Sequence, residues 1–419
     1  MRLGIFTAAL STALAAATVR AQTPTPTPAP APTVAPVDGG EALAPPLASV
    51  DDGSSHTSRH AAVTFSGYVE AFYSFNFNLP ANDITAYRGF DNRHNTFSIA
   101  NAVLDAAWAL GPVSGRIGLQ IGTTPETYYL AEPVRGATAG VGASGPNVWK
   151  YLQQANVAWR APAGRRGILL EAGLFLSPIG PEGMAVKDQW NWSRSNLFYG
   201  LPFYHTGLRA TVALSDRWSA TAAVYNGWNN VTDNNDEKAV SAQFTYALAD
   251  RLTVNLLYFG GVERPPGAPE GRAWRHLLDA YAVWYPTAAL SLLVHADAGV
   301  EPNDLGTAYW AAGALYARLR TTAWLYLAAR GDFFYEVRPP GGTVIFWPGG
   351  SDGLGWVSSG TFTLDARPHD NVSIQLEYRH DQGAVPMFFS RTAVPDGMGG
   401  LAATARAQDT ATLGITTWF

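Results

Sequence analysis

The chain has 419 residues, of which 15% are charged and 12% aromatic, and its formal net charge is −5. It has no cysteine, which excludes a disulfide scaffold, a cysteine-ligated metal centre, a thiol nucleophile and a bacterial lipoprotein anchor. The mild acidity and the dispersed basic residues argue against nucleic acid as a partner. Few charges together with many aromatics are expected where apolar and polar residues alternate, as in an outer-membrane barrel.

The N-terminal residues 1–21 have the pattern of a secretory signal peptide. Arg2 supplies the positive start, residues 3–17 are apolar, and small side chains precede a cleavage after Ala21. The apolar stretch is shorter than the ~20 residues of a membrane-spanning helix. We therefore expect export with cleavage of this segment.

A proline-rich segment follows at residues 22–60. Thr-Pro and Ala-Pro alternate first, and a polar, Gly/Ser-rich stretch comes next. Proline fixes φ and removes a hydrogen-bond donor, so this composition predicts an extended, disordered periplasmic spacer. The folded domain is expected to be residues 61–419.

From Phe65 onward the dominant hydrophobic period is two. Residues 371–379, 251–259 and 290–298 are the clearest examples, each with one apolar and one polar face. About sixteen such segments are recognisable, each about 10–13 residues long, which is enough for a tilted strand to cross a membrane. They begin near Phe65, Phe97, Val113, Trp149, Gly167, Tyr204, Arg217, Lys238, Arg251, Arg275, Ala289, Ala308, Thr322, Trp356, Asp370 and Gln408.

Short and long connections alternate between these segments. Tight turns such as Gly111-Pro112 and Ala249-Asp250 are followed by long Gly/Pro/Asn-rich connections such as residues 177–203 and 381–407. Regular alternation of short and long connections is typical of transmembrane barrels, which have short periplasmic turns and long external loops. The sequence predicts an all-β, antiparallel transmembrane barrel of about 16 strands, with 12–18 as the range of the count.

Several motifs resemble the OmpL-like family of outer-membrane β-barrel porins over residues 65–419. They are residues 67–73, 94–97, 173–182, 190–195, 202–207, 225–228 and 377–381. The chain also ends on Phe419, which resembles the C-terminal aromatic signal read by the barrel assembly machinery. The resemblance implies a water-filled channel for passive diffusion of small hydrophilic solutes in a Gram-negative outer membrane.

The expected partners are outer-membrane lipid, the assembly machinery and the solutes, with no nucleic acid. Neither a cofactor nor a metal ion is expected. Porins of this size are commonly homotrimers, but nothing in the sequence identifies a subunit face.

Strand parity places charged side chains on the lumen face of the barrel. Arginine and acidic residues are nearly balanced in this set, which leaves the ion preference open. The expected lumen residues are Glu70, Arg116, Glu171, Arg209, Arg217, Asp279, His295, Asp297, Arg318, Arg320, Arg330, Asp332, Asp365, Arg367, Glu377 and Arg379.

The connection Ser177–Phe203 is the best candidate for a loop that folds into the barrel and narrows the pore. We expect it to present its charged and aromatic groups to solute, because indoles and guanidinium groups suit stacking on sugars or aromatic molecules. The loop residues predicted to form the constriction are Glu182, Lys187, Asp188, Trp190, Trp192 and Arg194.

Two other classes of function stay open at this point. One is an outer-membrane barrel enzyme or a non-conducting structural or binding barrel, and the other is a secreted soluble all-β binding protein. His380 and Asp381 at a strand end are similar to pairs in membrane proteases, but no nucleophile–base–orienter set has a recognisable spacing. We therefore expect no catalytic residues.

Overall fold

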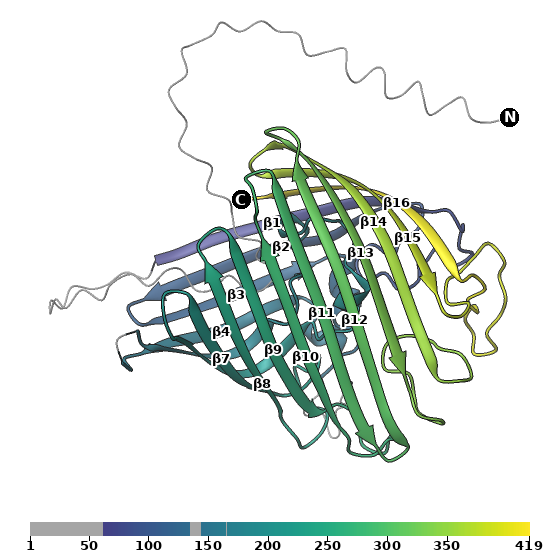
Figure 1. Ribbon diagram of the computed structural model, residues 1–419, viewed down its shortest axis with the longest axis horizontal. Helices are drawn as coiled ribbons and strands as arrows, with labels where there is room; N and C mark the ends of the chain where they lie inside the picture. The colour runs from purple at the N-terminus through teal and green to yellow at the C-terminus, as the bar shows by residue number, and fades with distance from the viewer. Residues whose placement is uncertain (1–61, 135–143, 165) are drawn as a thin grey trace, which may run out of the picture. The chain divides into compact units, whose positions relative to one another are not determined.

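A computed structural model describes residues 62–134, 144–164 and 166–419. The predicted signal peptide (1–21) and spacer (22–60) lie outside the described residues. Sixteen antiparallel strands close into one barrel, in which each strand pairs with its neighbours in sequence and β1 pairs with β16 (Figure 1). The strands are β1 (Ala62–Asn76), β2 (Thr96–Leu110), β3 (Val113–Ile121), β4 (Leu152–Ala161), β5 (Ile168–Leu176), β6 (Tyr204–Ala213), β7 (Trp218–Tyr225), β8 (Ala239–Leu248), β9 (Leu252–Val262), β10 (Trp274–Trp284), β11 (Leu290–Asn303), β12 (Gly306–Arg320), β13 (Leu325–Val337), β14 (Leu354–His369), β15 (Val372–Gly383) and β16 (Ala407–Trp418).

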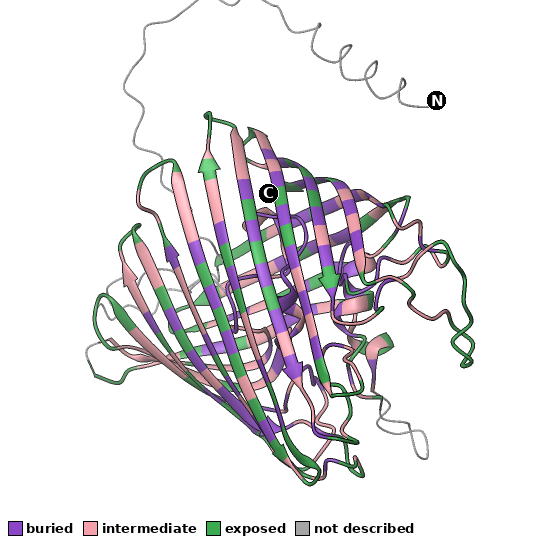
Figure 2. Cartoon of the chain, turned by 45° about the vertical axis from the view of Figure 1, so that its right-hand side comes forward, coloured by how far each residue is buried: buried purple, intermediate pink, exposed green. Residues whose placement is uncertain are grey.

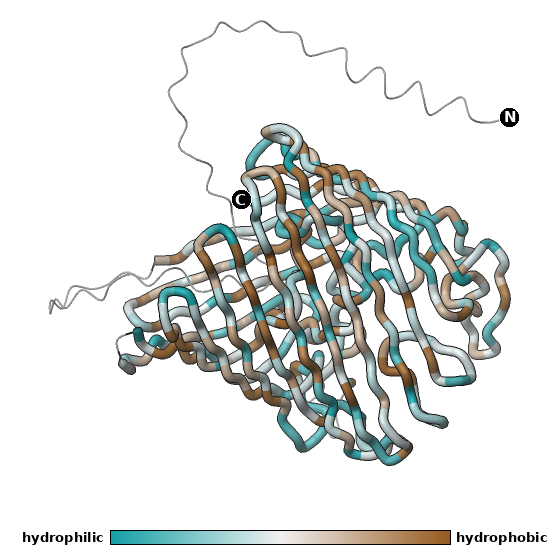
Figure 3. Tube along the Cα trace, viewed as in Figure 1, coloured by the Kyte–Doolittle hydropathy of each residue, from teal (hydrophilic) through white to brown (hydrophobic). Residues whose placement is uncertain are grey.

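The predicted fold class and strand count are confirmed. Side chains of a barrel wall alternate between two environments, so the period-two pattern marks each strand in the sequence. On β15, Ser373, Gln375 and Glu377 are buried, whereas Leu376 and Tyr378 are exposed on the outer surface. Figures 2 and 3 show this alternation of burial and hydropathy along the strands. The wall is apolar outside and polar inside, which suits a barrel surrounded by lipid.

The connections at the two ends of the barrel differ in length, as predicted. Residues 111–112 and 370–371 are tight turns at one end, where β1 begins and β16 ends. The opposite end carries long loops with four short helical segments, and no helix among the described residues is long and apolar enough to cross a bilayer. The helical segments are α2 (Thr123–Tyr128), α3 (Pro146–Trp149), the 3₁₀ turn η1 (Val186–Asp188) and α4 (Asn196–Tyr199).

The C-terminal residue takes part in closing the barrel. The Phe419 backbone N–H donates to the Gly67 carbonyl at 3.1 Å, and the Gly67 N–H donates to the Phe419 carbonyl at 3.2 Å. A side chain on Gly67 would collide with the Phe419 ring, since its Cβ would lie 2.9 Å from Cε1. The terminal aromatic ring therefore lies directly over the β1–β16 seam.

Candidate functional site

The loop of residues 177–203, here called the inward loop, lies inside the barrel. It leaves β5 and returns to β6, and the Ser177 N–H donates to the Phe203 carbonyl at 2.9 Å to close its base. Most of its residues are buried, and η1 and α4 belong to it. This connection therefore folds into the barrel, as predicted from the sequence.

Wall carboxylates accept hydrogen bonds from the backbone of the inward loop. Glu70 of β1 accepts from the Val186 N–H at 2.6 Å. Glu377 of β15 accepts from the N–H groups of Trp192 and Ser193 at 2.6 and 3.0 Å. An irregular loop has no strand partner for its N–H groups, and leaving them unpaired would be costly. Carboxylate oxygens are strong acceptors and supply those partners from the wall.

Two wall arginines hold the loop carbonyls in the same way. Arg330 of β13 donates to the Ser193 carbonyl at 2.6 Å and forms ion pairs with Glu182 and Asp332 at 3.3 and 3.1 Å. Arg379 of β15 donates to the Arg194 carbonyl. Three of the residues predicted to line the lumen therefore hold the loop in place and are themselves buried: Arg330, Glu377 and Arg379.

The expectation that the loop presents its aromatic and guanidinium groups to solute is wrong for three residues. Trp190 and Trp192 are 5% and 3% exposed, and Arg194 is 2% exposed. Trp192 packs against Phe72 with ring centroids 6.0 Å apart, and Arg194 donates to loop carbonyls, including that of Trp192 at 2.7 Å. Trp190 packs against Tyr316 of the wall with ring centroids 6.5 Å apart, so both indoles hold the loop against the wall and do not face solute.

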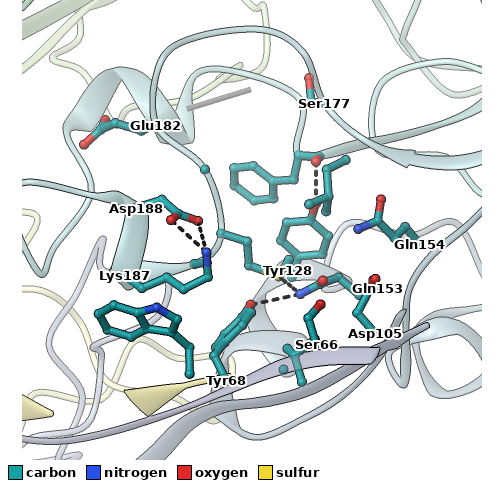
Figure 4. Close-up of a pocket in the computed structure, with 18 of the residues that line it drawn as sticks. Ser66, Tyr68, Asp105, Tyr128, Gln153, Gln154, Ser177, Glu182, Lys187 and Asp188 are labelled. Atoms are coloured by element: carbon teal, nitrogen blue, oxygen red, sulfur yellow. Dashed lines mark hydrogen bonds and ion pairs between the residues drawn. The ribbon is translucent and has the colours of Figure 1, made fainter. Parts of the chain in front are cut away.

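A cavity of about 260 Å³ remains between the inward loop and the wall formed by β1–β5. It extends from Trp418 and Phe419 at the short-turn end to Leu176 and Phe203 at the long-loop end. Figure 4 shows Lys187 and Asp188 on the loop facing Ser66 and Tyr68 on β1, with Asp105, Gln153 and Gln154 on the adjoining wall.

Charges in this cavity come in pairs. Arg116 forms an ion pair with Asp105 at 2.8 Å, and Lys187 forms one with Asp188 at 2.8 Å. The Lys187 and Asp188 side chains are each 28% exposed, which makes them the accessible charges of the inward loop. Glu182 lies at the same cavity but accepts from the Ser195 N–H at 3.0 Å.

Several of the remaining predicted lumen residues pair with one another, and Arg367, which pairs with Asp365 at 2.9 Å, also donates to the Lys187 carbonyl of the inward loop at 3.3 Å. Glu171 and Arg209 form a cross-strand ion pair at 2.6 Å, and Arg318 pairs with Asp365 at 3.1 Å. Arg320 ends β12 and donates to the carbonyls of Thr322 and Ala323 in the following turn, so it lies at the barrel rim.

Arg217 is a correction to the lumen assignment. It lies exposed in the turn before β7. The predicted strand began one residue too early. The alternation of side chains between the lumen and the outer surface holds only within a strand, so it does not place a turn residue.

The family model described as "Putative beta-barrel porin-2, OmpL-like" matches residues 62–417. The chain belongs to this porin family. No curated protein sequence matches it.

Solved structures with the same fold share little sequence with this porin. The anion-selective porin of Comamonas acidovorans is 10% identical, with a TM-score of 0.54 over 86% of this chain and 100% of that one. The outer membrane channel DcaP of Acinetobacter baumannii is 9% identical, with a TM-score of 0.53 over 87% and 99%. OmpT of Vibrio cholerae, in a trimer form, is 9% identical, with a TM-score of 0.52 over 86% and 100%.

Sequence reasoning missed two further loops of the porin that pack against inward-facing wall residues. Loop residues Trp347, Met387 and Phe388 belong to one buried cluster with wall residues that include Phe334. Glu336 of β13 accepts from the N–H groups of residues 345, 346 and 347, at 2.6, 2.7 and 3.1 Å. A run of large apolar residues in a loop expected to face water was the available signal.

Glu263, in the loop after β9, predicts a pH dependence of stability. Burial raises its pKa to about 7, against the opposing influence of Arg275, and it accepts from the Trp228 N–H at 2.9 Å. The folded state therefore binds this proton more tightly than the unfolded state, whose pKa is about 4.5. The contribution to stability is full below about pH 4.5 and is lost as the pH rises to about 7.

We expect Glu263→Gln to remove this part of the pH dependence. The free energy of unfolding should then lose a slope on the order of 1 kcal/mol for each pH unit. Urea unfolding of both proteins at about pH 5 and about pH 8 measures it, as the difference between the two pH dependences. Equal changes in unfolding free energy in the wild type and the variant would contradict the assignment.

Proposed function

We propose that this porin is a passive channel for small hydrophilic solutes, and that solute passes between the inward loop and the β1–β5 wall. The single observation that carries the proposal is the cavity along that wall. Its lining reaches from Trp418 near the short turns to Phe203 near the long loops. A barrel of this strand number has an interior wide enough for an aqueous path beside a folded-in loop.

The proposed path favours small polar solutes of either sign or none. Its polar lining comprises the Tyr68 hydroxyl, the amides of Gln153 and Gln154, and charges that are mostly paired. Rings of unpaired charge of one sign make a pore selective. Paired charges give weak selectivity and offer both donors and acceptors to a solute.

The Lys187–Asp188 pair provides the test of this path. We expect discrete ohmic steps from the refolded mature chain in a planar bilayer, with a small reversal potential in a KCl gradient. Lys187→Gln removes the cation and leaves Asp188, so the reversal potential should shift towards cation preference. Asp188→Asn should shift it in the opposite direction, because Lys187 is then uncompensated.

Arg166→Gln is the matched control, since Arg166 lies near a short turn and its ion-pair partner is the exposed Asp216. It should leave the reversal potential unchanged. A folded barrel that does not conduct would contradict the channel. Conduction with no shift in either Lys187→Gln or Asp188→Asn would contradict this path and leave the channel standing.

The proposal includes export and assembly. Residues 1–21 are proposed as a cleaved signal peptide, residues 22–60 as a periplasmic spacer, and Phe419 as the assembly signal. A homotrimer is the proposed assembly, which the trimer form of the Vibrio cholerae neighbour supports. We propose no catalytic activity, in line with the porin family.

A further inference from the structure

Two aspartates and a histidine are buried together on the inner face of β10 and β11. Asp279 lies directly opposite Asp297 in the strand register. His295 is two residues before Asp297 and therefore shares its face. The three residues are 0%, 3% and 1% exposed. Like charges directly opposite each other on neighbouring strands are destabilising, so this arrangement calls for a compensating cation.

The three side chains do not satisfy one another. His295 Nε2 lies 2.7 Å from Asp279 Oδ2 and 3.2 Å from Asp297 Oδ1. Asp279 Oδ1 and Asp297 Oδ2 have no hydrogen-bond partner in the part of the chain that the structure describes. The ion pairs described for both aspartates involve only this histidine. With both aspartates ionised, their two negative charges exceed the single positive charge that a protonated imidazole can supply.

The geometry points to a binding site for one divalent transition-metal ion, of the Zn²⁺ class, held by Asp279, His295 and Asp297. Each residue offers one ligand atom, and these atoms lie within 4.8 Å of one another. Two carboxylates and a neutral imidazole around a divalent ion form a neutral complex. The divalent ion therefore balances both carboxylate charges, whereas a protonated imidazole balances only one.

The separations of the ligand atoms already suit such an ion. Ligands at about 2.0–2.1 Å in a tetrahedron lie roughly 3.3 Å from one another. The distance of 3.2 Å between His295 Nε2 and Asp297 Oδ1 meets this value. The distance of 2.7 Å between Nε2 and Asp279 Oδ2 needs only a small side-chain movement.

The donor set selects the class of ion. An imidazole nitrogen with two carboxylate oxygens favours Zn²⁺ and its neighbours over Ca²⁺ and Mg²⁺, which prefer oxygen ligands. Three protein donors leave the fourth tetrahedral position for water.

The inward loop covers this site. A Cβ on Gly180 would lie 3.3 Å from His295 Cε1, and the φ of Gly180, +79°, also disfavours a side chain there. Gly180, which has no side chain, can therefore cover the site without displacing the His295 imidazole. The site does not depend on conduction by the porin.

Metal content of the folded barrel tests the proposal. The untagged mature chain is refolded in detergent with excess Zn²⁺, passed through gel filtration, and analysed for zinc by mass spectrometry. We expect about one Zn²⁺ per chain for the wild type and almost none for Asp279→Asn/Asp297→Asn. Asp365→Asn is the matched control: it removes a buried lumen carboxylate that has arginine partners, and it should retain zinc at the wild-type level.

Barrel formation in each variant is checked first by heat-modifiable gel mobility, and His295→Gln replaces the double variant if the latter does not fold. Refolding with Co²⁺ gives a second readout, because nitrogen and oxygen ligation produces visible absorption bands that should be absent from the variants. A wild type with less than about a tenth of an equivalent of zinc would overturn the site. Equal zinc retention in the variants would also overturn it.

Discussion

We expect deletion of Met184–Asn196 to raise the single-channel conductance of the refolded barrel several-fold. This segment contains η1 and the Trp192 side chain, and it lies across the lumen between the β1 wall and the β13–β15 wall. Its removal adds the volume that the segment occupies to the present cavity. Conductance follows the narrowest cross-section of a water-filled path, so the change should be large.

The deletion should leave the barrel folded. The strand ladder is continuous without the loop, since each strand bonds to both of its neighbours. Glu377 and Arg330 lose their loop partners, but water that enters the lumen can hydrate them. Heat-modifiable mobility of the variant measures this directly.

A deletion of the same length elsewhere provides the control. Arg391–Ala403 belongs to a long loop whose residues are mostly exposed. The hydroxyl oxygens of the flanking Ser390 and Thr404 lie 2.7 Å apart, so the two cut ends lie close together. This control should conduct like the wild type. If both deletions give the wild-type conductance, the inward loop is not the constriction.

The fold could be predicted from the sequence because every strand meets the same two environments. Lipid outside and polar lumen inside impose one alternation on every wall segment, and a one-residue slip would reverse it. The alternation in residues 372–379 therefore identifies both the strand and which of its side chains face the lumen. The error at Arg217 arose where the alternation runs into a turn.

The loop interior could not be predicted in the same way. An irregular segment has no side-chain period, so nothing in the sequence gave the direction of Trp190 or Trp192. The Trp192 ring fits against Gly414 of β16, where a Cβ would lie 2.2 Å from the ring. That complementarity joins positions that only the closed barrel brings together. Parity likewise placed Glu377 and Arg330 in the lumen but could not identify their partners on the loop.

Arg330→Met should lower the free energy of unfolding by about 3–5 kcal/mol, the usual cost of breaking a buried ion pair. The Arg330 side chain has no exposed surface, and its guanidinium group also donates to the Arg194 carbonyl at 3.2 Å and to Thr361 Oγ1 at 3.0 Å. Methionine keeps most of the volume but leaves Glu182 and Asp332 without this cation. Urea unfolding of the refolded barrel measures the loss.

Additivity distinguishes loss of the charge network from loss of packing. Adding Asp332→Asn to Arg330→Met removes one of the stranded charges, so the double variant should be more stable than the sum of the two single changes predicts. Arg320→Met is the control, because Arg320 donates only to turn carbonyls in the described contacts and should change stability by no more than about 0.5 kcal/mol. If Arg330→Met were as mild as Arg320→Met, the arginine would not be anchoring the loop. The inward loop would then depend on its aromatic packing, and the wall carboxylates would be the next residues to substitute.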